Sequence, residues 1–321
     1  MLKMILAFFA HIFGFKSDVD DVSGPCFESL EPKTLMSAAP ISVGVDAWGT
    51  LQVHGTERGD KVAIEVRGGP NGDVTSVTVG NMTSVFMDVK AMRVNLGAGK
   101  DNLKMSLIAP DQLVPITVNA GDGNDVIRFE AVGLSHDNSL RVYLNGDAGN
   151  DKIYVNSDTS VSVFGGVGRD FITTTQTLSF QVHHWFYGDA GNDRLVTHTG
   201  GYLSGGAGND RLISKSMFGS TIVTGSGNDI AKGFGNHTSF RIEGSGNKKI
   251  VGGSGMDYVL VSIGPVWNGT FYEAGPPFTG KIVFNGMGGE NYITVPTNFD
   301  QSQLQVKSAI IFTHDTNGGK G

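Results

Sequence analysis

The chain has 321 residues and a formal net charge of −7, with 47 glycines, 10 prolines and one cysteine. This acidic balance disfavours nucleic acid and anionic membranes as partners, and a single cysteine excludes an internal disulfide. Glycine is about twice as frequent as usual while proline is scarce, which excludes collagen and proline-rich disordered chains. Hydrophobic residues make up 39% of the chain, which is enough to bury a core.

An apolar stretch near the start of the chain predicts an export segment. One lysine precedes the run from Ile5 to Phe15, which is too short to cross a bilayer, where about 20 residues are needed. Its length suits the hydrophobic region of a signal peptide. His11 interrupts the run and no small-residue cleavage site follows promptly, so a frayed amphipathic helix is the alternative. We predict a leader over residues 1–40 and no transmembrane span.

The end of this leader resembles the LEPR-XLL motif, which stands ahead of large extracellular repeat proteins of bacteria. The similar residues run from Leu30 to Ala38, with Lys33 in place of the arginine and Met36 in place of the second leucine. The resemblance implies export or display at a bacterial cell surface. It says nothing about chemistry.

The chain then repeats a glycine-rich turn that ends in the pattern Gly-x-Asp-x-aliphatic. From Asp101 to Asp229, consecutive acids are 24, 26, 19, 23, 17 and 19 residues apart. Irregular steps with constant turn chemistry indicate stacked coils joined by loops of variable length. Imperfect copies carry Asp60, Lys248 and Glu290 at the position of the acid. The complete copies end at Asp101, Asp125, Asp151, Asp170, Asp193, Asp210, Asp229 and Asp257.

Short runs rich in Val, Ile, Thr and Phe separate these turns and predict strands. A coil of 17 to 26 residues holds two or three strands of about five residues each. We therefore predict an all-β fold over residues 41–312, a right-handed parallel β-helix or β-roll-like solenoid with coils of irregular length. The segment from Leu304 to Phe312 is the predicted cap of the last coil, and residues 313–321 are predicted to be a disordered tail.

The repeated acid needs an explanation beyond the turn. Glycine tolerates positive φ, and asparagine would serve such a turn as well as aspartate. Carboxylates stacked at the strand spacing of about 4.8 Å repel one another by roughly 0.9 kcal/mol in water and about 3.5 kcal/mol at an effective dielectric of 20. Cations between the coils would remove this repulsion. Carboxylates and open glycine carbonyls are the oxygen ligands that Ca²⁺ prefers.

The turns resemble the hemolysin-type calcium-binding repeat (RTX), and residues 205–213 are the fullest match. The resemblance implies that turn carbonyls and the aspartate of one coil join those of the next around each calcium ion. The family repeats its motif every nine residues, whereas that spacing occurs here only between Lys248 and Asp257. One motif per long coil predicts a single calcium column on one edge, which Lys248 interrupts by putting its ammonium in place of an ion.

The ligand role is carried over from the RTX family to ten aspartates. Eight end the complete motifs, while Asp147 and Asp189 stand at the second glycine position and either add a ligand or face solvent. The implied metal residues are Asp101, Asp125, Asp151, Asp170, Asp193, Asp210, Asp229, Asp257, Asp147 and Asp189.

Two other functions stay open. A carbohydrate-active β-helix enzyme, a polysaccharide lyase or epimerase, would draw on His183, His184, Trp185 and Tyr187. Adjacent histidines in a strand point to opposite faces and do not share one metal. An adhesive or ice-binding solenoid would use threonine-rich segments such as residues 172–177. We expect calcium ions and an extracellular polysaccharide or cell surface as partners, and no enzyme activity.

Overall fold

The computed structural model describes residues 40–314, apart from 70–71, 112, 134–140, 176–181, 263–265, 268–271, 274–277 and 297–298. All of the described residues belong to the unit Ala38–Gly321. The predicted leader, its LEPR-XLL-like motif and residues 315–321 of the predicted tail lie outside the described residues.

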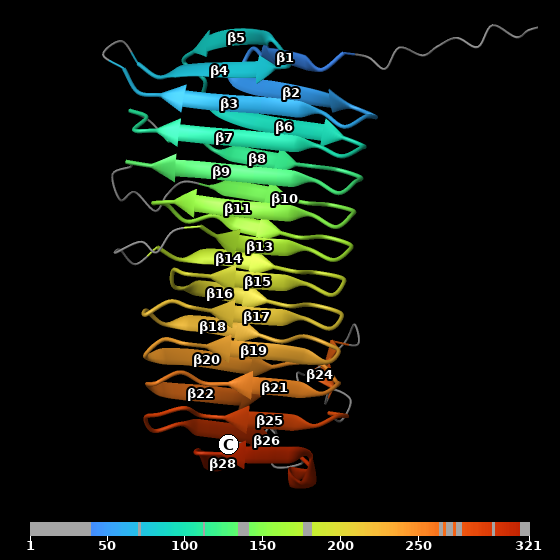
Figure 1. Cartoon of the computed structure of the whole chain (residues 1–321), viewed down its shortest axis with the longest axis vertical. Helices are drawn as coiled ribbons and strands as arrows, with labels where there is room; N and C mark the ends of the chain where they lie inside the picture. The colour runs from blue at the N-terminus through green and yellow to red at the C-terminus, as the bar shows by residue number, and fades with distance from the viewer. Residues whose placement is uncertain are drawn as a thin grey trace, which may run out of the picture. The chain divides into compact units, whose positions relative to one another are not determined.

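Two long sheets of 13 strands each build this unit, and the chain alternates between them (Figure 1). Beyond the first coil, all neighbouring strands within both sheets are parallel. Sheet A consists of β1 (Ser42–Val45), β2 (Thr50–Thr56), β6 (Ala91–Gly97), β8 (Ile116–Asn119), β10 (Val142–Asn145), β12 (Ser162–Phe164), β14 (His184–Tyr187), β16 (Gly201–Ser204), β18 (Ser220–Val223), β20 (His237–Ile242), β22 (Met256–Val261), β26 (Tyr292–Pro296) and β28 (Ile310–His314). The predicted all-β parallel solenoid is confirmed, with two strands per coil.

Sheet B forms the other wall. Its strands are β5 (Met82–Met87), β4 (Val74–Val79), β3 (Lys61–Arg67), β7 (Asn102–Ile108), β9 (Val126–Val132), β11 (Lys152–Ser157), β13 (Phe171–Thr174), β15 (Arg194–Thr197), β17 (Arg211–Ser214), β19 (Asp229–Gly233), β21 (Lys248–Val251), β25 (Ile282–Asn285) and β27 (Leu304–Lys307). A short antiparallel pair, β23 (Val266–Trp267) and β24 (Tyr272–Glu273), lies in the segment between β22 and β25. A 3-10 helix, η1 (Gln301–Gln303), precedes β27.

Strand β9 shows why these segments are extended and stacked. Its sequence alternates, so that Ile127, Phe129 and Ala131 are buried while Arg128 is exposed on the outer face. Burying one large apolar side chain completely stabilises the fold by about 1.5–3 kcal/mol. A shift of one residue would turn this whole set toward solvent, so the alternation sets the register of each coil on the next.

Two kinds of turn connect the sheets. The turns that lead from sheet A to sheet B, here called the A-to-B edge, stack on the right of Figure 1. From the turn between β6 and β7 to the turn between β18 and β19 their shape is nearly uniform. The turns that lead back, here called the B-to-A edge, vary in length. A long one spans residues 133–141 between β9 and β10, and a short one spans residues 198–200 between β15 and β16. The irregular steps between motifs therefore arise mainly at the B-to-A edge.

The two ends of the solenoid differ. At the N-terminal end, β1 pairs with β2 and β3–β4–β5 form a meander, all antiparallel. At the C-terminal end, the predicted cap, Leu304–Phe312, forms most of the last coil, and its strands continue both sheets in parallel. Ile311 is in register with the core residue Ile293 but is 44% exposed. The segment therefore extends the stack by one coil, and its role as a cap stays a prediction.

Candidate metal centre

Seven of the eight predicted acids stack on the A-to-B edge, each directly before or at the first residue of a strand of sheet B. Their side chains are at most 2% exposed. Main-chain bridges such as Ala190 to Ala207 join each turn to the next and hold the acids in line. The seven residues, here called the acid column, are Asp101, Asp125, Asp151, Asp170, Asp193, Asp210 and Asp229.

One oxygen of each carboxylate builds a hydrogen-bonded ladder. The backbone N–H of Asp193 donates to Oδ1 of Asp210 at 2.8 Å, and that of Asp210 donates to Oδ1 of Asp229 at 2.9 Å. The same bond begins at Asp60, whose N–H donates to Asp101 at 2.7 Å. Each acid therefore ties its own coil to the preceding one.

The other oxygen has no partner in most of the column. Oδ2 is buried without a hydrogen bond in Asp101, Asp125, Asp151, Asp170, Asp193 and Asp210. A buried polar atom without a partner is costly, and a buried charge is more so.

Burial shifts the protonation of these acids. Burial, with a smaller contribution from the neighbouring carboxylates, raises the pKa of Asp151 and of Asp193 to about 7. Burial likewise raises the pKa of Asp210 to about 6. These side chains therefore favour a bound proton, or another positive charge, over the bare ionised form.

The glycines of the motif make room for this arrangement. A Cβ on Gly205 would lie 2.5 Å from Oδ2 of Asp210, so the first glycine lets the carboxylate turn into the bend. Gly208 has φ of 136°, and a Cβ there would lie 1.5 Å from the carbonyl oxygen of Gly191 in the preceding coil. Glycine is thus required for close approach of the coils as well as for its backbone conformation.

Lys248 ends the acid column with a positive charge. Its ammonium donates to the carbonyl oxygens of Gly225 and Gly227 at 2.7 Å each, to that of Ser245 at 3.2 Å, and to Oδ2 of Asp229 at 2.6 Å. These four oxygens are here called the oxygen cage. The side chains of Lys248 and Asp229 are both 0% exposed. The cage therefore accommodates a cation in the dry interior of the turn.

Three of these four positions recur one coil earlier. Gly206 and Gly208 correspond to Gly225 and Gly227, and Asp210 corresponds to Asp229, because the two turns are in parallel register. In this earlier coil Oδ2 of Asp210 has no partner. Within the described residues, no three His, Cys, Asp or Glu side chains converge on one point. A cation there would take most of its ligands from backbone carbonyls.

Asp257 does not belong to the acid column. It is the second residue of β22, at the B-to-A edge, where it is in register with Thr238 on one side and Asn291 on the other. Its Oδ1 accepts from the N–H of Thr238 at 3.1 Å and its Oδ2 from that of Gly253 at 2.8 Å, so both oxygens are satisfied. The predicted single column therefore fails for Asp257, because a step of nine residues from Lys248 covers only about half of a coil of 17 to 26 residues.

The strand register also corrects or refines the positions predicted for other acids of the turns. Glu290 lies one residue too early, and Asn291 occupies the position in register with Asp257. Asp147 and Asp189 are exposed, with φ of 69° and 67°. Oδ2 of Asp147 accepts from the N–H of Gly121 at 3.1 Å, which leaves both acids on the solvent side of the turn.

Asparagines form a second ladder that the sequence did not predict. The amide oxygen of Asn209 accepts from the N–H of Asn228 at 2.8 Å, and that of Asn228 from the N–H of Asn247 at 2.9 Å. Similar bonds link Asn124 with Asn150. The signal in the sequence was the asparagine that directly precedes the acid in five of the eight complete motifs.

The histidine pair splits between the two faces of β14, as predicted. His184 is buried, accepts from the N–H of Val161 at 3.3 Å, and has its pKa lowered by burial to about 3. His183 is exposed beside Trp185, where it lines a hollow of about 320 Å³. The threonine-rich segment gives an ice-binding surface little support, since Thr173 and Thr174 are buried.

No protein-family model, no curated protein and no solved structure matches this chain. The resemblances to the RTX repeat and to the LEPR-XLL motif therefore remain predictions. Among the described residues, the structure contains no helix with the length and apolar character needed to cross a membrane.

Proposed function

We propose that this protein is a calcium-binding β-solenoid whose ions lie inside the A-to-B turns and brace successive coils. The observation that carries the proposal is the oxygen cage around Lys248. A cage that holds an ammonium ion through three carbonyls and a carboxylate has the ligand chemistry of a cation site. The coils above it repeat these oxygens without a lysine.

The ligand types favour calcium over other divalent cations. Ca²⁺ takes six to eight oxygen ligands at about 2.3–2.6 Å in flexible geometry, whereas Mg²⁺ demands a near-ideal octahedron and keeps several waters. The residues at each level would be the aspartates of two adjacent coils, such as Asp193 and Asp210, together with glycine carbonyls of the turns. Bound calcium supplies the positive charge that the buried, unpaired Oδ2 atoms lack.

The function of such a device is mechanical. Each coil depends on its neighbours for burial of its apolar side chains. An ion that binds only the stacked form adds its binding free energy to the free energy of unfolding. In a secreted or surface-displayed chain without disulfides, millimolar extracellular calcium would thus keep the solenoid folded.

Calorimetric titration of the full chain with Ca²⁺, and with Mg²⁺ as the control ion, tests this proposal. We expect calcium binding with dissociation constants of about 10⁻⁴ to 10⁻³ M, the range of extracellular modules. Melting curves with and without chelator provide the second readout. Absence of heat on titration together with identical melts in calcium and in chelator would show that the acid column is a hydrogen-bonded ladder and no metal site.

A further inference from the structure

The outer face of sheet B is positively charged in a chain that is acidic overall. Six of the eight strands from β7 to β21 each present one basic side chain of this face outward. The residues, here called the basic face, are Lys104, Arg128, Lys152, Arg194, Arg211 and Lys249. Lys104 and Arg128 are in direct register, and the other four share a second row, in which Phe171 and Ile230 hold the two remaining positions. All six are exposed. On β19, the neighbouring outward position carries Lys232.

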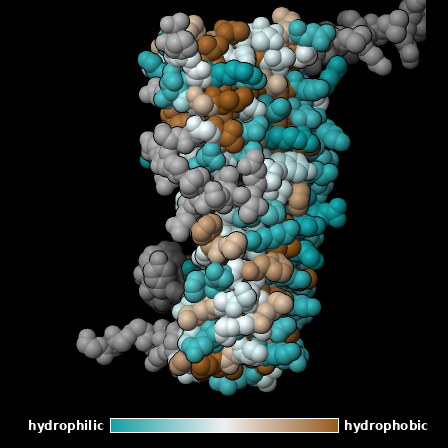
Figure 2. All heavy atoms as spheres, turned by 60° about the vertical axis from the view of Figure 1, so that its left-hand side comes forward, coloured by the Kyte–Doolittle hydropathy of each residue, from teal (hydrophilic) through white to brown (hydrophobic). Residues whose placement is uncertain are grey.

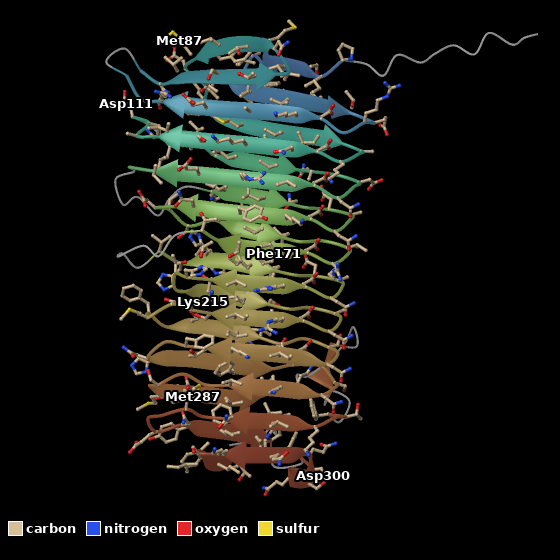
Figure 3. The ribbon with its side chains drawn as sticks, viewed as in Figure 1. Met87, Asp111, Phe171, Lys215, Met287 and Asp300 are labelled. Carbon is tan, nitrogen blue, oxygen red and sulfur yellow. The ribbon has the colours of Figure 1, made fainter. Side chains whose placement is uncertain are left out.

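Figure 3 shows nitrogen-tipped side chains along this face above and below the labelled Phe171. In Figure 2, which turns the same face to the right, hydrophilic side chains follow the long direction of the sheet there. The acids of the motif lie in the turns instead, while the face itself carries Glu65 and Glu130 near its N-terminal end. From β11 to β21, the outward positions of the sheet carry basic, neutral polar or apolar side chains and no acid.

The basic side chains form no salt bridge within the described part of the chain. The salt bridges there involve Arg67, Arg241 and Lys248. Arg194 lies directly beside Arg211 on the adjacent strand. Like charges in such cross-strand neighbours destabilise a sheet, so the arrangement is costly unless an anion lies over it.

Aromatic rings are interleaved with these charges. The guanidinium of Arg128 lies 5.2 Å from the ring centroid of Tyr154, and that of Arg194 lies 5.5 Å from the ring centroid of Phe171. Lys104, Arg128 and Tyr154 also line a hollow of about 230 Å³ on the same face. Stacking on the rings holds the guanidinium groups in place while their remaining N–H donors stay available.

We infer that the basic face binds an extended acidic polysaccharide, a chain of uronic acid residues lying across the strands of sheet B. One sugar residue is about as long as one strand spacing of ~4.8 Å, so successive carboxylates would meet successive coils. Arginine pairs with carboxylates through two parallel N–H···O bonds. The half-buried rings of Tyr154 and Phe171 offer flat surfaces for the C–H faces of sugars.

A nucleic acid fits this surface less well. The four-residue strands β13, β15 and β17 make the face only about 13 Å wide. A duplex would overlap the turn edge, where Asp147 and Asp189 are exposed and would repel its phosphates. The basic face and the oxygen cages are separate surfaces, so binding at one does not require an ion at the other.

The test measures binding of an oligouronate of about six residues, which spans about six strand spacings, to the full chain by calorimetry. A neutral glucan oligomer of the same length and a short DNA duplex serve as comparison ligands. The variant is Arg194→Gln with Arg211→Gln, and the matched control is Lys90→Gln with Arg93→Gln, which removes the same charge from exposed residues outside the basic face. Circular dichroism in each assay buffer, with calcium and with chelator, verifies that every protein is folded.

We expect the oligouronate to bind the wild type and the control equally, and the Arg194 and Arg211 variant about tenfold more weakly, with an affinity that falls as salt rises. No binding by the folded wild type would overturn the inference, even if calcium titration succeeds. An equal loss in the control would show unspecific charge attraction and overturn it too. Equal or tighter binding of the DNA or of the neutral glucan would reject an acidic polysaccharide as the ligand.

Discussion

The ammonium of Lys248 lies 2.6 Å from Oδ2 of Asp229, and both side chains are fully buried at the end of the acid column. Burial raises the pKa of Asp229, and the hydrogen bond from Lys248 reduces that rise. One lysine thus supplies at this level the positive charge that the coils above lack within the chain. The predictions below test what this charge does and whether calcium replaces it elsewhere.

Replacing Lys248 by methionine should leave the Asp229 carboxylate buried and unpaired. Removing one partner of a buried ion pair costs about 3–5 kcal/mol. We expect a loss of this size in urea unfolding with chelator present, partly restored by calcium, because the emptied cage then accepts an ion. Lys249→Met is the control, since Lys249 is the next residue in the chain and its side chain is exposed. Equal stability of the two variants in chelator would contradict a stabilising role of the pair.

Asp210→Asn should separate the charge of the acid from its hydrogen bond. The amide keeps an oxygen for the N–H of Asp193 and replaces the unpaired Oδ2 by a neutral group. We expect weaker calcium binding, while the calcium-free protein at pH 8 is as stable as the wild type or more so. A protein destabilised equally with and without calcium would show that the acid only serves the turn.

Asp257→Asn provides the comparison on the opposite edge. Both oxygens of Asp257 accept backbone N–H groups, so an amide nitrogen would face one of these donors. We expect a loss of about 1–3 kcal/mol from this unsatisfied contact, measured by urea unfolding, and no change in calcium binding. A fall in calcium stoichiometry in this variant would mean that the B-to-A edge also holds an ion.

The calcium-free protein should lose stability as pH rises. The pKa values of Asp151 and Asp193 in the folded state are about 7, because burial raises them from 3.8. In the interval between these values the folded state binds more protons than the unfolded state, so unfolding becomes easier as protons leave. The contribution of these two carboxyl groups to the free energy of unfolding is thus fully present below about pH 4 and is lost toward pH 7.

Thermal melts from pH 4 to pH 8 in chelator measure this effect, and the same series in calcium is the comparison. Calcium should flatten the profile above pH 6, because the ion then replaces the proton at Oδ2. Its affinity should fall at low pH, where protons compete for the same oxygens. If the melting temperature in chelator instead rose with pH through this interval, the raised pKa values of these buried carboxyl groups would be contradicted.

Gly205→Ala tests the close approach inside the turn. The added Cβ would lie 2.5 Å from Oδ2 of Asp210 and 2.5 Å from the carbonyl oxygen of Thr224. We expect a loss of roughly 2 kcal/mol or more from this overpacking, in line with other small-to-large changes at packed positions. Gly219→Ala is the control, since its nearest contact is 3.8 Å away. Similar melting temperatures for the two variants would mean that the turn relaxes freely.

Local chemistry made several features readable in the sequence. Alternation in segments such as β9 predicted strands, and the glycine-rich turns predicted stacked coils, because both patterns follow from backbone geometry within a few residues. The repeat also located the seven acids of the column and the exception at Lys248. The opposite directions of His183 and His184 followed from the period of a strand.

Only the tertiary structure decided the features that depend on how neighbouring coils stack on one another. The placement of Asp257 on the opposite edge follows from the nine-residue step from Lys248, which spans about half a coil. The bond from Asp193 N–H to Asp210 joins residues 17 apart. The basic face appears only when outward positions of strands separated by turns of variable length are brought into register, as Arg194 and Arg211 are. Such contacts depend on the whole stack, because the inner apolar faces of neighbouring coils set the register that brings the outer charges together.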